Sequence, residues 1–183
     1  MPYAEPYETV DLNHDGHAVG PDSADPGQAP PWSRARAALE SSGGPAGAAF
    51  LGTVRPDGRP HSAGVGALWH DGDLYFISGP GARKARNLAA NPAATLSIVT
   101  PDIHLVFEGT AARVTDSAVL ESLAAAYRQV GWPAEVAGDA FVAPFNAPSA
   151  GPPPWHLYRL TFHTAFGIGT SAPSGASRWR FDR

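Results

Sequence analysis

Basic residues gather at the start of a short predicted helix, directly after a glycine-rich turn. The predicted strand Leu74–Ser78 is followed by the turn Gly79–Gly81, and the helix then opens with Arg83, Lys84 and Arg86. Cations are unfavourable there, because a helix N-terminus already carries a partial positive charge. A bound anion would compensate that charge by accepting hydrogen bonds from the turn and from Arg83 and Lys84. The pattern therefore indicates either an anion-binding site or a solvated basic helix face.

The remaining residue types exclude several kinds of catalytic chemistry. The chain has no cysteine, which removes disulfides, thiolate metal sites and cysteine nucleophiles. Its seven histidines show no spacing typical of metal ligands. The sequence contains no Gly-x-Ser-x-Gly elbow and no acid pair of the kind that hydrolases use. It therefore predicts no metal site, gives no support to hydrolase chemistry and identifies no catalytic side chain.

Composition limits the partners that the protein can have. The chain has 183 residues and a formal net charge of −4, with 43% hydrophobic and 16% charged residues. This length fits one domain with a real core, and the low charge favours a second subunit that covers part of the surface. The acidic balance gives no indication of nucleic-acid binding, and no apolar run is long enough to cross a bilayer. Because no secretory signal is apparent, we expect a cytoplasmic protein.

Hydrophobic alternation and turn residues predict a chain that is mainly β, with a few helices. Seven short antiparallel strands fit a barrel better than an open sheet, because closure removes exposed edges. The predicted strands are Ala48–Arg55, Pro60–Trp69, Leu74–Ser78, Ala94–Thr100, His104–Val114, Trp155–Thr161 and Thr164–Ile168. The predicted helices begin at the cap Ser33, cover Ala82–Ala90, and run from the cap Asp116 to about Val130.

Two long stretches fall outside these elements. Residues 1–30 are rich in proline, aspartate and glycine but poor in aliphatic side chains, so we expect an extended or disordered arm before a domain at 31–183. Residues 131–154 form a loop that is long for a compact domain, which favours a functional loop. Its aromatic residues could wall a pocket for a planar substrate or pack at a subunit interface. The predicted pocket residues are Trp132, Phe145, Asn146, Trp155 and His156.

Three motifs follow one another in an order and spacing that resemble a known family. They are Leu51–His61, the basic run Arg83–Leu88 between Tyr75 and Pro92, and Phe107–Ala111. Together they resemble the pyridoxamine-phosphate-oxidase-like split barrels, over residues 32–183. The C-terminal segment Ser177–Phe181 makes the chain most similar to the actinobacterial branch of flavin/deazaflavin oxidoreductases.

The resemblance implies a split β-barrel of the FMN-binding type that works as a homodimer, with the cofactor between its subunits. The implied cofactor is FMN or the deazaflavin coenzyme F-420. Its phosphate would contact the basic run, and its ring would lie along small residues of the second strand. The implied cofactor-binding residues are His61, Ser62, Ala63, Gly64, Val65, Ser78, Arg83, Lys84 and Asn87, with Arg178 and Trp179 reaching the cofactor of the other subunit.

By the same resemblance, the protein is an oxidoreductase that transfers a hydride between this cofactor and a conjugated small molecule. The alternatives are a non-catalytic flavin- or deazaflavin-binding carrier protein and a structural dimer with a vacant groove. Family members that oxidise pyridoxamine phosphate have a basic residue in the second strand, whereas Ser62–Ala67 has none, so that substrate is not expected. The additional arginines Arg55, Arg59 and Arg86 favour the deazaflavin, because its acidic tail is longer than that of FMN.

Overall fold

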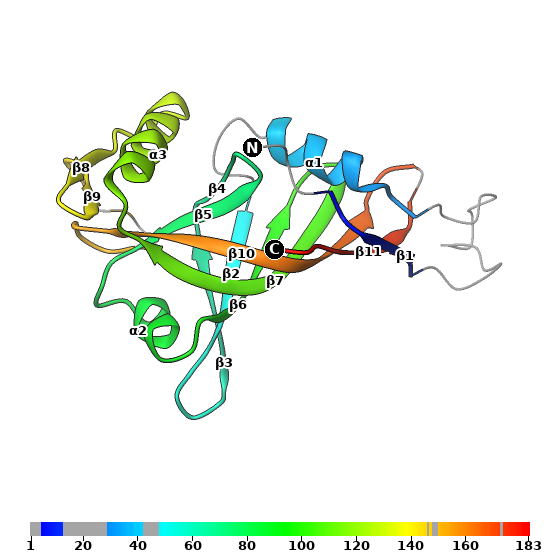
Figure 1. Ribbon diagram of the computed structural model, residues 1–183, viewed down its shortest axis with the longest axis horizontal. Coiled ribbons are helices and arrows are strands. Elements are labelled where there is room, and N and C mark those ends of the chain that lie inside the picture. The colour runs from blue at the N-terminus through cyan, green and yellow to red at the C-terminus, as the bar shows by residue number, and fades with distance from the viewer. Residues whose placement is uncertain (1–4, 13–28, 42–47, 146, 148–149, 173) are drawn as a thin grey trace.

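A computed structural model describes residues 5–12, 29–41, 48–145, 147, 150–172 and 174–183 (Figure 1). In this part of the chain, nine strands form one antiparallel sheet in the order β1-β11-β10-β7-β6-β2-β3, with β5 and then β4 added alongside β10. The strands are β1 (Glu8–Asp11), β2 (Ala48–Val54), β3 (Pro60–Val65), β4 (Ala67–His70), β5 (Asp73–Ser78), β6 (Ala93–Val99), β7 (Ile103–Val114), β10 (His156–Gly169) and β11 (Ala176–Arg180). The helices are α1 (Trp32–Ser41), α2 (Arg83–Ala90) and α3 (Ser117–Gln129), and β8 (Glu135–Ala137) and β9 (Ala140–Val142) form a separate hairpin.

The sheet curls into an open barrel because one extended segment serves two neighbours. β3 pairs with β2, but after Gly66 the chain continues as β4 and pairs with β5 instead. β5 pairs with one end of β10, which pairs along its whole length with β7. The path β10-β5-β4 and the path β3-β2-β6-β7 therefore enclose a common interior, split where β3 passes into β4. The single strand predicted over 60–69 is thus two strands, and the mainly β split barrel is confirmed.

Strand β10 differs from its prediction as two strands. It runs without interruption from His156 to Gly169, with a bulge against β7 between Phe162 and Thr164. The bulge inserts His163 and shifts the alternation of buried residues by one position, so that Phe162 and Ala165 are both buried. In the sequence, this interruption of the alternation between buried and exposed residues resembles the end of a strand. The short strands β8, β9 and β11 were not predicted, and β8 and β9 lie in the loop expected to be irregular.

Part of the stretch expected to be an arm joins the sheet. β1 pairs with β11 through the register Glu8 to Arg180 and Asp11 to Ser177, and Glu8 Oε2 lies 3.2 Å from Arg180 Nε. An edge strand is held by backbone hydrogen bonds, so it needs few aliphatic side chains. Composition alone therefore does not reveal it. The domain boundary at residue 30 stays a prediction, and residues 1–4 and 13–28 lie outside the described part of the chain.

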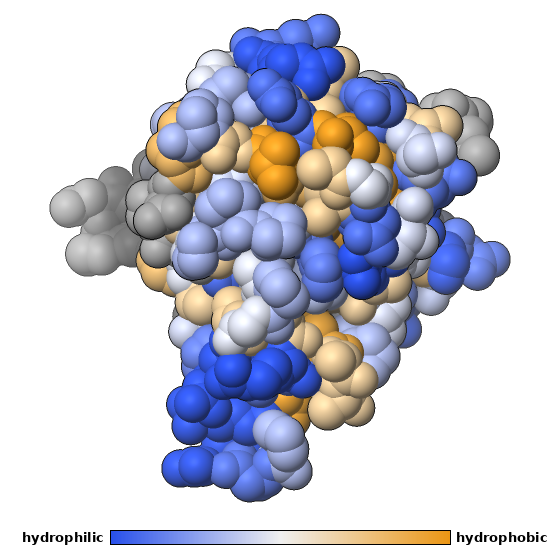
Figure 2. All heavy atoms as spheres, turned by 90° about the vertical axis from the view of Figure 1, so that its left-hand side faces the viewer, coloured by the Kyte–Doolittle hydropathy of each residue, from blue (hydrophilic) through white to orange (hydrophobic). Residues whose placement is uncertain are grey.

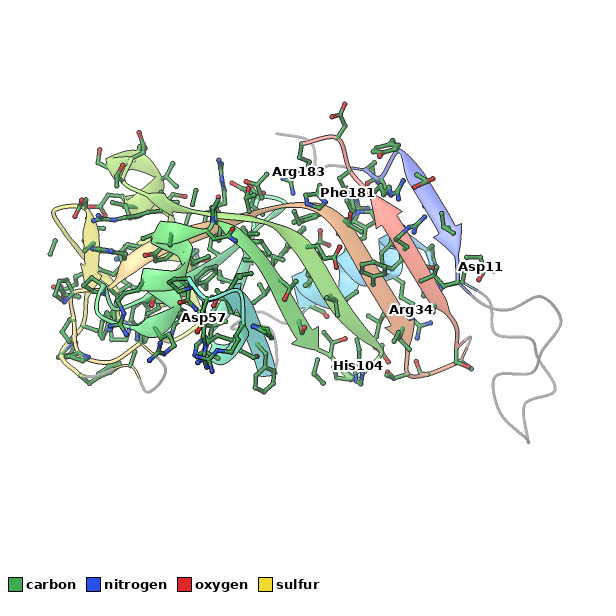
Figure 3. All side chains as sticks on the ribbon, turned by 90° about the horizontal axis from the view of Figure 1, so that it is seen from below. Asp11, Arg34, Asp57, His104, Phe181 and Arg183 are labelled. Carbon is green, nitrogen blue, oxygen red and sulfur yellow. The ribbon has the colours of Figure 1, made fainter. Side chains whose placement is uncertain are left out.

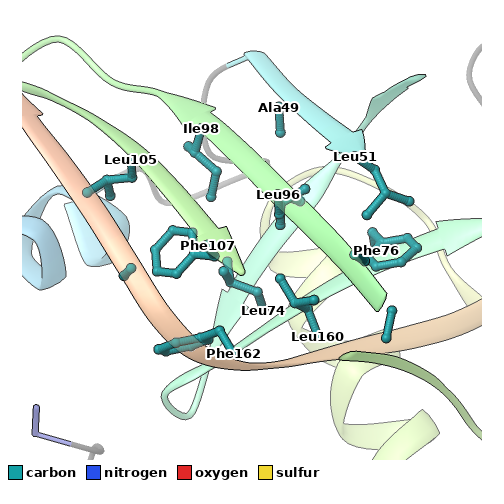
Figure 4. Close-up of a cluster of buried hydrophobic side chains, with 14 of the residues drawn as sticks. Ala49, Leu51, Leu74, Phe76, Leu96, Ile98, Leu105, Phe107, Leu160 and Phe162 are labelled. Carbon is teal, nitrogen blue, oxygen red and sulfur yellow. The ribbon is translucent and has the colours of Figure 1, made fainter. Parts of the chain in front are cut away.

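Large apolar side chains fill the barrel interior (Figure 4). Leu51, Leu74 and Phe107 have no exposed surface. Helix α1 packs on this core through Trp32, whose ring lies 4.9 Å from that of Phe181. Burial of such aromatic side chains contributes more to folding than any other single residue type does. Ser33 lies inside α1 rather than at its cap, because the helix begins at Trp32, two residues earlier than predicted.

A second apolar cluster lies between α3, the β8–β9 hairpin and β5. The side chain of Asp116 caps α3 as predicted, because its Oδ1 accepts a hydrogen bond of 2.9 Å from Val119 N. Leu120, Leu123 and Tyr127 form the buried face of the helix. None of the helices in the described part has the length and hydrophobicity that crossing a membrane requires.

Candidate cofactor site

The β2–β3 hairpin and α2 are joined by a buried polar contact. Asn87 on α2 donates from Nδ2 to Oγ1 of Thr53 on β2 at 2.9 Å. The Thr53 hydroxyl in turn lies 3.4 Å from the carbonyl oxygen of His61, its partner across the hairpin. Thr53 is 4% exposed and Asn87 is 2% exposed, so these hydrogen bonds replace lost hydration. They fix the helix against the strand that was predicted to carry the cofactor ring.

Four basic side chains converge at this junction. Burial lowers the pKa of His61, and the positive charges of Arg55, Arg83 and Lys84 lower it further. Such an effect requires these charges to lie near the imidazole. The Nε of Arg55 is buried and has no hydrogen-bond partner among the described residues. The protein thus concentrates positive charge here although its net charge is −4.

Lys84 is the only lysine in the sequence, and it is 3% exposed. Lysine is almost never fully buried unless its charge is compensated. Burial lowers the pKa of Lys84, because removal of water disfavours the ammonium form. An anion beside the amine would favour the ammonium form. The burial of this lysine beside Arg83 makes the start of α2 a candidate anion site.

The start of α2 also has features that would favour a bound anion. Its N-cap residue, Ala82, makes no side-chain cap hydrogen bond, and the first turn contains no acidic residue. The preceding turn is held in place by Gly79, whose N–H donates to Ala150 O at 3.1 Å. A Cβ at Gly79 would collide with that same oxygen, so the close approach requires glycine. Ser78 is fully buried, and its hydroxyl donates to Gly79 O at 3.2 Å.

Strand β3 offers an open edge for a flat ring. In the described part of the chain it pairs with β2 alone. Ser62 and Gly64 are exposed on the side of the sheet away from the core, His61 and Ala63 are half-buried, and Val65 is in the core. A Cβ at Gly64 would meet no atom within 4 Å, so this stretch leaves room for a ligand. Figure 2 shows hydrophilic surface gathered at the lower end of the molecule, where Figure 1 places α2 and the hairpin turn.

A hollow lies beside β3 on the outer face of the sheet, the face turned away from the core. Its volume is about 340 Å³, and residues of β2, β3, β6, β7 and β10 line it. Gly52, Thr95 and Gly109 form part of the wall, and Glu108 and His163 are its titratable groups. It adjoins the predicted ring strand at Pro60. This hollow is therefore better placed for a substrate than the predicted loop pocket.

The structure does not bring Arg178 and Trp179 to this site. β11 is separated from β3 by β10, β7, β6 and β2, and Figure 3 shows Phe181 and the hairpin residue Asp57 apart, with β6 and β7 between them. Trp179 is completely buried against Trp32, at a ring distance of 5.5 Å. The ring of Trp179 is a core residue of its own chain, and its contact with the other subunit's cofactor stays a prediction. Arg178 points to the outer face, where it lies 4.0 Å from Glu8.

The predicted loop pocket is not formed as one pocket. Trp155 is fully buried in the second cluster and donates from Nε1 to Gly151 O at 2.9 Å, and Trp132 packs beside it at a ring distance of 5.4 Å. Trp155 belongs to the core, whereas Trp132 is half-buried and packs against the same cluster. Phe145 is 47% exposed and Asn146 lies outside the described residues. His156 lines a different hollow, next to α2.

Sequence reasoning missed Thr53 as a site residue and assigned Arg55 only to a cofactor tail. Alternation along β2 would have placed Thr53 inward, level with the apolar Leu51 two residues before it. A polar side chain at an inward position needs a hydrogen-bond partner, which Asn87 supplies here. The position of Arg55 depends on the hairpin turn, and no local pattern gives it.

Fold and site together define a split barrel with a cluster of basic side chains at the β2–β3 hairpin and the start of α2. The sequence profile of the family described as Pyridoxamine 5'-phosphate oxidase matches residues 35–168. The chain belongs to this family.

One curated relative shares part of the sequence. The Pyridoxine/pyridoxamine 5'-phosphate oxidase of Bacteroides thetaiotaomicron is 41% identical over 71 residues, which are 37% of this chain and 33% of the relative. The match thus spans about a third of that protein's length.

Solved structures share the fold at low sequence identity. A NimC/NimA family protein from Clostridium acetobutylicum has a TM-score of 0.55 at 17% identity, over 80% of this chain and 90% of that chain. A pyridoxamine 5'-phosphate oxidase-related, FMN binding protein from Nostoc punctiforme has a TM-score of 0.55 at 20% identity, over 84% and 98%. PhzG from Burkholderia lata, in complex with tetrahydrophenazine-1-carboxylic acid, has a TM-score of 0.52 at 18% identity, over 82% and 85%. These similarities establish the architecture.

The contact between Thr53 and Asn87 can be tested in the free protein. We expect Asn87→Ala and Thr53→Val each to lower the free energy of unfolding by ~1–3 kcal/mol, because each leaves a buried polar group without its partner. The double variant should lose less than the sum, with a coupling of at least ~0.5 kcal/mol. Urea denaturation of the four proteins measures this. Strictly additive losses would contradict a direct contact between Thr53 and Asn87.

Proposed function

We propose that the protein is a flavin-dependent oxidoreductase that binds FMN between the β2–β3 hairpin and the start of α2. The observation that carries the proposal is the buried Lys84 beside Arg55, His61 and Arg83. These residues offer charge-assisted hydrogen bonds to a phosphate, which is dianionic near neutral pH. Ser78 and Asn87 border the same turn and helix, and the open edge of β3 takes the flat ring.

The choice between FMN and the deazaflavin coenzyme F-420 depends on the additional arginines. Arg59 pairs with Asp57 at 2.7 Å, and Arg86 donates from Nη1 to Gly81 O at 2.7 Å. Arg59 is therefore compensated by a carboxylate, and Arg86 lines a different hollow, so neither arginine belongs to the cluster around His61 that would meet a long acidic tail. This favours FMN, whose single phosphate needs only the converging cluster. The Nostoc protein of the same fold is an FMN binding protein, which adds support.

The chemistry follows from what the chain can and cannot supply. When bound, the cofactor accepts or donates a hydride, so no protein nucleophile is needed. The protein's residues hold the phosphate, position the ring along β3 and exclude water from it. The substrate, a conjugated small molecule, would lie against the ring in the outer hollow, where Glu108 and His163 can exchange the accompanying proton. Because Ser62–Ala67 lacks a basic residue, we do not assign pyridoxamine phosphate as the substrate.

A second copy of the chain would complete this site. The outer face of the sheet exposes a row of large apolar side chains, with Phe50 48%, Val99 44% and Ile168 59% exposed. Phe50 lies directly opposite Gly64 in the β2–β3 register, so a subunit that covers this face also covers the ring strand. A twofold dimer buries the same patch on both copies. We therefore propose a homodimer with the cofactor at its interface.

Replacement of Lys84 by an uncharged residue tests the phosphate site. We expect Lys84→Met to weaken FMN binding by roughly tenfold to a hundredfold, because a charge-assisted hydrogen bond is lost. The free protein should keep its stability or gain some, since the pKa of Lys84 is already lowered by burial. Calorimetric titration of both proteins with FMN and with coenzyme F-420 gives the affinities. Arg128→Gln on α3 is the control, and it should bind as wild type does.

Two outcomes would contradict this assignment in different ways. Equal affinity of wild type and Lys84→Met for both cofactors would remove the phosphate site. Tighter binding of coenzyme F-420 than of FMN by wild type would keep the site but replace the cofactor.

A redox assay separates the enzyme from a carrier protein. We expect anaerobic FMN-loaded protein, once reduced with dithionite, to reduce the quinone menadione at least about tenfold faster than free reduced FMN at the same concentration. The reason is that the hollow beside β3 holds donor and acceptor together. Stopped-flow absorbance of the flavin follows the reaction. A rate no faster than that of free FMN would favour the carrier.

The dimer can be tested through its apolar face. We expect wild type to have twice the monomer mass in light scattering, and Ile168→Asp to have the monomer mass and weakened FMN binding. A charge at the centre of an apolar interface costs several kcal/mol. The control is Tyr7→Asp, because Tyr7 is 67% exposed but lies outside the outer face. A monomeric wild type that still binds FMN tightly would contradict the proposal.

A further inference from the structure

A second hollow lies on the side of α2 away from the β2–β3 hairpin. We call it the α2 groove; its volume is about 580 Å³, and it is bounded by Arg86 and Ala89 of α2, Ala111 and Arg113 of β7, and His156 of β10. It does not share its lining with the hollow beside β3. The helix therefore stands between the proposed cofactor site and the α2 groove.

The floor of the α2 groove is apolar and rigid. Leu88, Ala89 and Ala111 contribute methyl and methylene groups to it. The ring of Tyr158 also lines it and is stacked on Phe76, with a centroid distance of 5.3 Å and an interplanar angle of 5°. A flat apolar surface of this kind accepts an aromatic or short aliphatic body.

The polar groups of the α2 groove differ in charge. Arg86 donates from Nη1 to Gly81 O at 2.7 Å, which fixes the guanidinium, and no carboxylate in the described part of the chain lies within 4.0 Å of it. Arg113 is compensated, because its Nη2 lies 2.6 Å from Asp139 Oδ2. The groove thus carries one uncompensated positive charge on a group that can bind a carboxylate through two parallel hydrogen bonds.

The other two polar groups are neutral at physiological pH. Burial lowers the pKa of His156, and Arg113 lowers it further, while Asp139 acts in the opposite direction. Burial raises the pKa of Tyr158, so its phenol keeps the proton. His156 and Tyr158 can therefore form hydrogen bonds with a ligand without adding charge. The single positive charge of Arg86 would be balanced by a ligand with one negative charge.

We propose that the α2 groove binds a small amphipathic carboxylate, with its carboxylate at Arg86 and its flat apolar body on the floor of Leu88, Ala89 and Ala111. A monoanion fits better than a phosphate, because a dianion would meet a single uncompensated arginine. This site is separate from the phosphate site at Lys84, and it does not depend on the proposed cofactor. Its ligand and FMN can therefore be bound at the same time.

Calorimetric titration with 2-naphthoate tests the proposal, and the uncharged 2-naphthamide serves as the matched probe. We expect wild type to bind 2-naphthoate at least about tenfold more tightly than 2-naphthamide. Arg86→Gln should weaken 2-naphthoate binding by roughly tenfold to a hundredfold, because the charged hydrogen bonds are lost. The control is Arg128→Gln, since Arg128 also donates to a backbone carbonyl at 2.7 Å but lies on α3. That variant should bind 2-naphthoate as wild type does.

A second variant fills the groove without a change of charge. Ala112 is an exposed residue of β7 that lines the groove, so Ala112→Phe should abolish 2-naphthoate binding and leave the melting temperature nearly unchanged. The titrations are repeated with saturating FMN, which should leave the 2-naphthoate affinity within about twofold. Equal affinities of wild type, Arg86→Gln and Ala112→Phe would overturn the proposal. Competition between FMN and 2-naphthoate would overturn it too, by placing the probe in the cofactor site.

Discussion

At Gly66 one extended segment leaves β2 and joins β5, and this exchange of partners shapes the functional surface. A closed barrel has no free edges, but here β3 keeps one, because its continuation β4 pairs elsewhere. The same geometry leaves the outer face of β2, β6, β7 and β10 uncovered within one chain. An open edge next to an apolar face is unstable as a monomer surface and suited to a ligand and a second subunit. The proposed site therefore lies where closure of the barrel is incomplete.

The candidate site gathers positive charges whose proximity opposes folding. Placing Lys84 under 3% exposure beside Arg83, Arg55 and His61 opposes folding, because desolvation and repulsion both disfavour the charged forms. The hydrogen bond between Asn87 and Thr53 and the burial of Leu88 hold α2 in place against this repulsion. Local rules are commonly broken in this way at functional sites. The proposed phosphate would offset this cost with charge-assisted hydrogen bonds.

The sequence revealed the features that local rules govern. Turn residues and alternation predicted the barrel strands, the glycine turn and the basic start of α2, and Asp116 was recognised as a cap. Prediction from the sequence failed where the structure depends on contacts between distant segments. The pairing of β1 with β11 depends on backbone contacts between the two ends of the chain, and no local signal marks it. The family resemblance of the C-terminal segment implied that Trp179 contacts the cofactor, whereas its burial depends on packing against α1.

The prediction that the aromatic residues of the loop form a pocket failed for a related reason. Trp132 and Trp155 are conspicuous in a proline-rich stretch, and an aromatic residue serves equally well in a pocket wall and in a core. The packing around α3 decides between the two: Trp155 is fully buried there, and Trp132 lies half-buried against the same cluster. His156, one residue after Trp155, points to the other side of β10 because side chains alternate along a strand. The predicted pocket was thus divided between a core and the α2 groove.

Helix α2 connects these observations, because eight residues are too few to hold a helix in water without tertiary contacts. Asn87 ties one side of it to β2, Ala85 and Leu88 enter the core, and Arg86 ties its first turn to Gly81 O. Its first turn carries the proposed phosphate contacts, and its opposite side forms a wall of the α2 groove. Because the contacts of Asn87, Ala85, Leu88 and Arg86 already hold the helix without a ligand, occupation of one side leaves the other side nearly unchanged. The two sites therefore share one stabilising element, although they share no lining residue.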